Sequence, residues 1–429
     1  MKKKMKIVVY VFALMLVVSC NNTPKKENNS STLKEQPNLS AKDILGNPDY
    51  PAISYGGYRA KSRDVQPTIS ELKDDMKLLH AMGIRMIRTY NVQPNLPHAS
   101  NILIAITELK KEDPNFEMYV MLGAWIDCLN AWTDETPNHD VESAQNEGEI
   151  TRAVALANKY PDIVKVVAVG NEAMIRWATS YFVRPNVILK WVNHLQNLKK
   201  SGELPKDLWI TCSDDYASWG GGDPSYRVKD LEDLIKAVDY VSMHTYAYHN
   251  SHYNPGFWKV ADNEQSLSDI EKVDAAMLRA LDFAKTQYKN VSEYVKSVDS
   301  TKTIHIGETG WASISNGHYG INGSRATDQY KQGAYYNHLR KWTKKEGISC
   351  FYFEAFDEQW KDAENPEGSE NHFGLINLKG EAKYPLWNMV DNGVFKGLTR
   401  NGKPITKTYN GNINTLLKDV LVPNTDYKR

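Results

Sequence analysis

The sequence predicts an α/β protein with a single domain folded as a (β/α)8 barrel of the TIM type. Strand-like and helix-like segments alternate from about residue 50, and they complete eight cycles, the number that closes such a barrel. The chain has 429 residues, 41% of them hydrophobic, which is enough to fill one large core. A doubly wound open sheet is the alternative fold. It would normally carry a GxGxxG loop after an early strand, and ISYGGYR does not match that pattern.

The strand candidates are rich in β-branched and aromatic residues. In chain order they are residues 52–59, 84–91, 117–125, 164–172, 208–215, 240–248, 303–311 and 350–358. Between them, apolar residues recur at three- and four-residue steps, as in residues 68–83 and 186–202, and a glycine ends both of these runs. Residues 269–298 have the same periodicity, and we expect a helical region with one break.

Most predicted strands begin with apolar residues and end with polar or aromatic ones. Glu172 ends the fourth strand and Glu308 lies near the end of the seventh. The carboxyl ends of the strands of a barrel meet at one mouth, so these side chains are expected to gather there. Burial of so many unpaired acids in a core would be costly, which favours a functional mouth over a structural explanation.

The N-terminus is typical of an export signal. Lysines precede the apolar run IVVYVFALMLVV, which has signal-peptide length and is short for a bilayer span. The run ends in VVSC, which resembles the lipobox of bacterial lipoproteins. We therefore expect residues 1–20 to be a lipoprotein signal peptide with Cys20 as the lipidated residue, although an ordinary cleaved signal remains the alternative. Residues 21–49 are polar and predict a tether. The protein is then exported and held at the membrane of the bacterial cell envelope, with the outer membrane or cell surface favoured.

Charge and cysteine content exclude several classes of protein. The 52 Lys and Arg residues balance 52 Asp and Glu residues, so no nucleic-acid partner is expected. Cys128, Cys212 and Cys350 have unrelated spacings and predict neither a disulfide scaffold nor a metal site. His244 is expected to make hydrogen bonds rather than to bind a metal. We expect no metal, no organic cofactor and a monomer.

Glu172 and Glu308 form the candidate catalytic pair. Strands four and seven lie nearly opposite each other in an eight-stranded barrel, so their glutamates can flank one substrate. Cleavage of a glycosidic bond uses such a pair, since one acid protonates the departing oxygen and a second carboxylate attacks or stabilises the sugar cation. The acid needs a raised pKa and its partner must stay ionised. Asn171 is placed to bond a sugar 2-hydroxyl, and Trp311 to form an apolar floor for the sugar.

Motifs in order from about Tyr50 to Asn388 resemble glycoside hydrolase family 17, the β-1,3-glucanases and related glucanosyltransferases. The matching segments are SYGGYR, IRTYN, VAVGNEA, MHTYAY, GETGWAS, FEAFDEQWK and NHFGLIN. The resemblance implies that Glu172 is the acid/base and Glu308 the nucleophile. It also implies reaction with retention and a glutamate separation of about 5–5.5 Å. One departure is Ala312, where the family commonly has proline.

The strand-end positions and the resemblance together predict the substrate-binding residues. These are Tyr55, Arg88, Tyr90, Asn171, Tyr246, Trp311, Glu354, Glu358, Trp360 and Lys361. Arg88 and Lys361 are also placed to orient the catalytic carboxylates, with plain ion pairs at the barrel mouth as the alternative. Glu354 and Glu358 either bind sugar hydroxyls or neutralise Lys361.

The prediction is therefore a glycosidase acting on laminarin-type β-1,3-glucan by double displacement, with endo action favoured. Residues 50–390 form the single catalytic domain, and residues 391–429 form a C-terminal extension that packs on the barrel. Three alternatives remain: a β-1,3-glucanosyltransferase with the same two glutamates, a non-catalytic glucan-binding lipoprotein, and a barrel that acts on a β-1,4-linked glucan or mannan.

Overall fold

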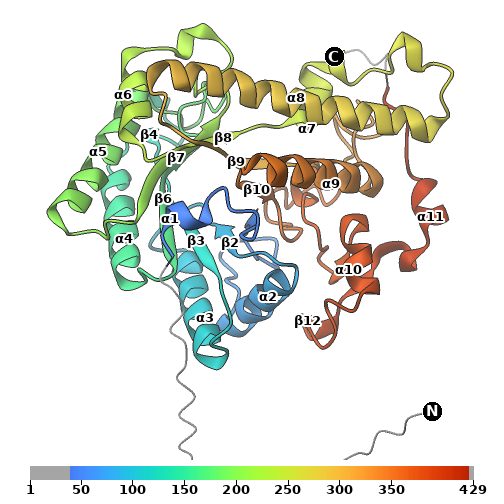
Figure 1. Ribbon diagram of the computed structural model, residues 1–429, viewed down its shortest axis with the longest axis horizontal. Coiled ribbons are helices and arrows are strands. Elements are labelled where there is room, and N and C mark those ends of the chain that lie inside the picture. Colours follow the sequence, from blue (N-terminus) through green and yellow to red (C-terminus); the bar gives the residue numbers. More distant parts are fainter. Residues whose placement is uncertain (1–38, 425–429) are drawn as a thin grey trace, which may run out of the picture. The chain divides into compact units, whose positions relative to one another are not determined.

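The structure, a computed structural model that describes residues 39–424, contains a closed barrel of eight parallel strands. The strands follow one another around the barrel in chain order, and helices surround them (Figure 1). They are β1 (Ala52–Ser54), β2 (Met86–Arg88), β3 (Tyr119–Ala124), β6 (Val164–Asn171), β7 (Trp209–Asp215), β8 (Val241–His244), β9 (Ile304–Gly310) and β10 (Cys350–Phe353). The predicted (β/α)8 barrel is confirmed, and the strands predicted as fourth and seventh are β6 and β9.

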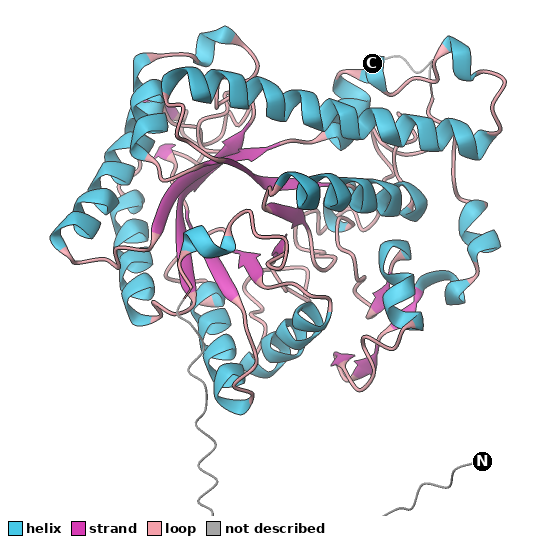
Figure 2. Cartoon of the chain, viewed as in Figure 1, coloured by secondary structure: helices cyan, strands magenta, loops and turns pink. Residues whose placement is uncertain are grey.

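The strands are buried along nearly their whole length because both of their faces are covered. Every residue of β3 and β9 is buried, and in β6 only the last residue, Asn171, is partly exposed. Helices cover the outside of the sheet, as Figure 2 shows, and side chains fill the inside. Continuous apolar runs such as VVAV (residues 166–169) therefore mark barrel strands here, in place of alternating apolar and polar residues.

Helices join successive strands. They are α2 (Ile69–Ala81), α3 (His98–Glu112), α4 (Gln145–Lys159), α5 (Pro185–Ser201), α6 (Lys229–Ala237), α7 (Ala247–Tyr253), α8 (Asp269–Val298) and α9 (Gln329–Glu346). The predicted break within 269–298 is wrong, because α8 is one helix of 30 residues. This segment contains neither glycine nor proline, and Ser268 and Glu271 form a capping box at its start.

A short helix closes the amino end of the barrel. In α1 (Ala41–Ile44), Ala41 and Ile44 are fully buried. They pack in one cluster with side chains of the barrel interior such as Met86 and Phe351. Residues 39–49 are thus part of the fold, which corrects the predicted extent of the tether, because a few apolar residues in a polar stretch suffice to cover the barrel floor. The signal peptide, Cys20 and the rest of the tether lie outside the described residues.

After β10 the chain forms small elements in place of a long eighth helix. They are β11 (Glu381–Ala382), α10 (Trp387–Asp391), β12 (Thr399–Arg400), β13 (Lys403–Pro404), β14 (Thr406–Lys407) and α11 (Ile413–Leu417). Arg400 is fully buried, and its Nε donates to Asp75 of α2 at 3.1 Å. The same carboxylate accepts from Arg59 at 2.9 Å. Through Asp75, these bonds link the segment after residue 391 to the first part of the barrel.

Within residues 39–424, no helix combines the length and the apolar character that crossing a membrane requires. Cys128, Cys212 and Cys350 are all buried, and each is a free thiol.

Candidate active site

Glu172 follows β6 in a left-handed backbone conformation, with φ at 47°. Bulky side chains rarely adopt this conformation, so the turn must be held by its surroundings. Residues of β7 hold it: the Glu172 N–H donates to the Ser213 carbonyl at 3.0 Å, and the Met174 N–H donates to Asp214 Oδ2 at 2.7 Å. The Gly-Asn-Glu segment therefore forms a fixed turn that presents Glu172 at the barrel mouth.

The surroundings of Glu172 favour its protonated form. Burial raises the pKa of Glu172 to about 8, and the negative charge of Glu308 adds to the rise while Arg88 opposes it. Oε1 of Glu172 lies 3.0 Å from His244 Nδ1. Glu172 therefore carries a proton at neutral pH, as a general acid requires.

Glu308 lies within β9 and is held as a carboxylate. Its Oε2 accepts from Arg88 at 2.6 Å and from the Tyr90 hydroxyl at 3.0 Å, and its Oε1 accepts from the Tyr246 hydroxyl at 2.5 Å. Burial by itself would raise the pKa of Glu308. Nearby positive charge and these hydrogen bonds outweigh burial and lower that pKa below its ordinary value. Arg88 supplies this positive charge at neutral pH. His244 does not, because burial lowers its pKa to about 4 and leaves the ring neutral.

The two glutamates face each other across the mouth. One oxygen of Glu172, one of Glu308 and a ring nitrogen of His244 lie within 4.8 Å of one another. Such a group is compact enough to contact one cation. Both oxygens of Glu308, however, are already taken by Arg88, Tyr90 and Tyr246. The arrangement therefore fits two carboxylates that act on one bond between them, one as an acid and the other as a base or nucleophile.

Two cavities open on either side of Glu308, with volumes of about 740 and 820 Å³. Glu308, Phe353 and Glu370 line both of them. The first cavity has an aromatic wall that comprises Tyr58, Trp125, Trp132 and Trp360. The second contains Glu172 and has Trp177, Tyr246, Tyr253 and Tyr319 in its wall. Flat rings can stack on sugar faces, so the two cavities together form a cleft suited to a chain of sugars.

The structure brings most of the predicted substrate-binding residues to this cleft. Those that line one of the cavities are Tyr55, Tyr90, Asn171, Tyr246, Glu358, Trp360 and Lys361. Their individual roles in binding a glucan stay predictions. Trp125 and Trp132 come from the stretch around the hairpin formed by β4 (Cys128–Leu129) and β5 (Asn138–Glu142).

Three predicted contacts with substrate are wrong. Trp311 is fully buried, and its indole N–H donates to the Ala326 carbonyl at 2.8 Å, so it cannot form a floor under a sugar. Arg88 is also buried, and it bonds Glu308 instead of lining either cavity. Glu354 is 1% exposed and accepts from Lys361 at 2.6 Å. Arg88 and Glu354 therefore position cleft residues, because they bond Glu308 and Lys361, respectively.

Glu370 is a cleft residue that the sequence did not indicate. It lies in the short 3-10 helix Ser369–Asn371 and lines both cavities. Burial raises its pKa, and the positive charge of Lys361 opposes that rise. No strand pattern leads to Glu370. The only available signal was its place directly before NHFGLIN, one of the motifs already singled out.

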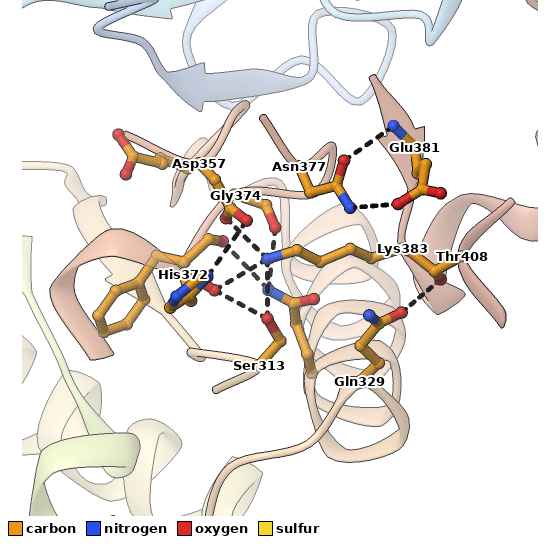
Figure 3. A network of polar contacts seen from close by, with 12 residues as sticks. Ser313, Gln329, Asp357, His372, Gly374, Asn377, Glu381, Lys383 and Thr408 are labelled. Carbon is orange, nitrogen blue, oxygen red and sulfur yellow. Dashed lines mark hydrogen bonds and ion pairs between the residues drawn. The ribbon is translucent and has the colours of Figure 1, made fainter. Parts of the chain in front are cut away.

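A buried network holds the loop that carries Glu370 (Figure 3). Lys383 Nζ donates to Asp357 Oδ1 at 2.7 Å, to Ser313 Oγ at 2.8 Å and to the His372 carbonyl at 3.0 Å. Asp357 follows β10, Ser313 follows β9, and His372 belongs to the loop that carries Glu370. Burial lowers the pKa of Lys383, and the charge of Asp357 opposes this. One ammonium group thus joins two neighbouring loops of the barrel mouth.

Replacing Lys383 with methionine is expected to destabilise the fold by about 3–5 kcal/mol, because it leaves the carboxylate of Asp357 buried without a cation. The exposed Lys379 on the same segment provides the control, and Lys379→Met should change stability by less than about 0.5 kcal/mol. Denaturant unfolding of both variants measures the difference. Equal stability of the two variants would show that the network contributes little.

A family model and a solved structure both match most of this chain. Residues 52–374 match the model of the BtgE/BtgC glycoside hydrolase domain. The crystal structure of an endo-laminarinase from Formosa Hel1_33_131 also matches, with 64% sequence identity and a TM-score of 0.89. This match covers 91% of the present chain and all of the laminarinase chain.

Two more distant matches come from fungi. The Aspergillus flavus protein named "Probable glucan endo-1,3-beta-glucosidase btgC" is 23% identical over 83% of this chain. That match covers 46% of the Aspergillus protein, so the present chain spans about half the length of such curated relatives. A glycoside hydrolase family 17 β-1,3-glucanosyltransferase from Rhizomucor miehei is 18% identical with a TM-score of 0.52, covering 79% of this chain and 96% of that one. At this identity the likeness shows the fold alone.

Proposed function

Because this chain belongs to the BtgE/BtgC glycoside hydrolase domain family, we propose that it is a retaining hydrolase of laminarin-type β-1,3-glucan. One observation carries the mechanism: one carboxylate oxygen of Glu172 and one of Glu308 lie within 4.8 Å of each other, and the two pKa values are shifted in opposite directions. Retaining glycosidases have carboxyl groups about 5–5.5 Å apart, whereas inverting ones need about 6.5–9.5 Å to admit a water molecule. The β-1,3-glucan specificity rests on the relatives, including the endo-laminarinase.

In the first step, Glu308 attacks the anomeric carbon while the glycosidic C–O bond breaks. Glu172 gives its proton to the departing oxygen, which leaves a glycosyl ester on Glu308 and a carboxylate at Glu172. In the second step, Glu172 takes a proton from water, whose oxygen attacks the same carbon and releases Glu308. Glu172 lines only the second cavity, so that cavity receives the leaving part of the glucan.

The cleft extends to both sides of Glu308, which favours cleavage within a chain. Incubation with laminarin, lichenan and cellulose, with products followed over time, tests the proposal. Mixed laminarin fragments at early times support endo action on β-1,3 links. Products longer than the starting glucan would indicate glucan transfer. No product from laminarin, or faster cleavage of cellulose, would overturn the substrate assignment.

The pH dependence of kcat/KM on laminarin should follow the two glutamates. Glu172 must be protonated, so activity should fall roughly tenfold per pH unit above its raised pKa of about 8. Glu308 must be ionised, and its lowered pKa places the acidic loss below its ordinary value of 4.5. Initial rates from about pH 2 to about pH 10 measure both limbs. A decline beginning near about pH 5, close to the ordinary pKa of a glutamate, would contradict the raised pKa of Glu172.

We also infer that the protein is lipid-anchored to the cell envelope through Cys20. The support is the VVSC segment after the apolar run. In a bacterial host, Cys20→Ala should lose palmitate labelling and leave the membrane fraction. Cys128→Ala, which alters a buried thiol, should keep both. Continued labelling of Cys20→Ala would rule out this anchor.

A further inference from the structure

Behind Glu172 lies a row of buried polar side chains to which the proposed mechanism assigns no part. Ser242 Oγ is 2.9 Å from Ser213 Oγ, which is 2.8 Å from His244 Nε2. The other ring nitrogen of His244, Nδ1, lies 3.0 Å from Glu172 Oε1. Ser213, Ser242 and His244 are fully buried. Four side chains from neighbouring strands thus form one continuous line of hydrogen bonds that ends at the acid/base.

A glycine in β9 provides the space for this chain. A Cβ on Gly307 would lie 2.1 Å from Ser242 Oγ and 2.4 Å from Ser213 Oγ, which is closer than real contacts allow. Any other residue before Glu308 would therefore displace both hydroxyls. Gly307, in the strand that carries Glu308, thus leaves room for the hydrogen bonds that lead to Glu172.

The direction of the hydrogen bonds follows from counting protons. Burial lowers the pKa of His244 to about 4, with Glu308, Arg88 and Asp214 as the charged groups around it, so the ring is neutral and has one N–H. Whenever Glu172 is ionised its oxygens only accept, and the N–H must then lie on Nδ1. Nε2 becomes an acceptor for the Ser213 hydroxyl, and the Ser242 hydroxyl donates to Ser213.

The reverse direction would work against catalysis. It requires the Glu172 proton on Oε1, where it would point to His244 and away from the substrate. No hydrogen bond from the described part of the chain is seen at Oε2, and Glu172 lines the cleft, so Oε2 is the oxygen left for the departing group. With the N–H on Nδ1, the same set of bonds serves both the protonated and the ionised glutamate without any rearrangement.

We propose that Ser242, Ser213 and His244 are positioning residues that fix the Nδ1–H tautomer of His244 and so keep the catalytic proton of Glu172 on Oε2. The inference rests on the proposed function of Glu172. In glycosylation that proton passes from Oε2 to the leaving oxygen as the C–O bond breaks, and a proton from water returns to Oε2 in the second step. His244 keeps its own proton throughout.

Variants of His244 and Ser213 test the proposal kinetically. The amide nitrogen of asparagine can stand near the place of Nδ1, whereas that of glutamine stands near the place of Nε2. His244→Gln and Ser213→Ala should therefore lower kcat/KM on laminarin by about tenfold or more. A dinitrophenyl β-laminaribioside, whose leaving group needs no proton, should lose less than about threefold. His244→Asn should lose less on laminarin than His244→Gln. Equal losses on both substrates, or no loss, would overturn the proposal.

A measurement without turnover tests the same point. Nitrogen-15 spectra of histidine-labelled protein report which ring nitrogen carries the proton, and the His244 signal is the one lost in His244→Asn. We expect the Nδ1–H form at about pH 6 and at about pH 9, on both sides of the raised pKa of Glu172. An Nε2–H form at the lower pH would refute the inference. An inactive wild type would defeat the proposed function, while this spectrum would still decide the tautomer.

Discussion

Glu308→Gln is expected to abolish laminarin hydrolysis, with a loss in kcat/KM on the order of 10⁴-fold or more. The amide is similar in size to the carboxylate but cannot form the glycosyl ester. Reducing-sugar release from laminarin measures the loss. The exposed Glu203 offers a matched control, since Glu203→Gln makes the same chemical change away from the cleft and should keep wild-type activity.

Glutamine is a better choice than alanine at this position. The side chain of Glu308 is 9% exposed and that of Arg88 is 1% exposed, so alanine would leave the guanidinium buried without its partner. A stability loss of about 3–5 kcal/mol would then obscure the loss of catalysis. Thermal melting of Glu308→Gln close to that of the wild type shows that the fold is intact. Substantial turnover by a folded Glu308→Gln would remove Glu308 from the mechanism.

Glu172→Gln is expected to lower kcat/KM on laminarin by about 10²–10⁴-fold, because the departing oxygen is no longer protonated. On a dinitrophenyl β-laminaribioside the first step should proceed nearly unchanged, since this leaving group departs without a proton. The second step should then stall, because no base activates water. A burst of dinitrophenol followed by a slow phase is the expected trace.

Azide provides a control for this variant. As an anion it needs no base, so it should restore turnover of Glu172→Gln and yield a β-glycosyl azide. The wild-type rate should not rise with azide. If Glu172→Gln loses activity equally on both substrates and azide has no effect, Glu172 does not act as the acid/base.

The barrel and its pair of glutamates could be predicted from the sequence because the signals for them are local. Segments rich in apolar residues, such as VVAV, mark strands that are buried on both faces, and eight strand-like segments mark the closed sheet. An acid at the carboxyl end of such a strand has to lie at the mouth, which places Glu172 and Glu308 together. The geometry of parallel strands leaves no other position for them.

Only the tertiary structure decided where the neighbouring side chains point. Trp311 lies three residues after Glu308 in the sequence, yet its ring packs into the core beside Trp258 and Tyr335. Position in a motif does not determine side-chain direction once a loop leaves the strand.

The same holds for groups that act through contacts between distant strands. Glu370 enters the cleft from a loop held by Lys383, and Ser213 and Ser242 reach Glu172 only through His244. Strand periodicity determined which residues stand at the mouth of this barrel. Hydrogen-bond partners far apart in the chain decided which of them face the substrate, because buried polar groups must satisfy one another wherever the folded backbone brings them together.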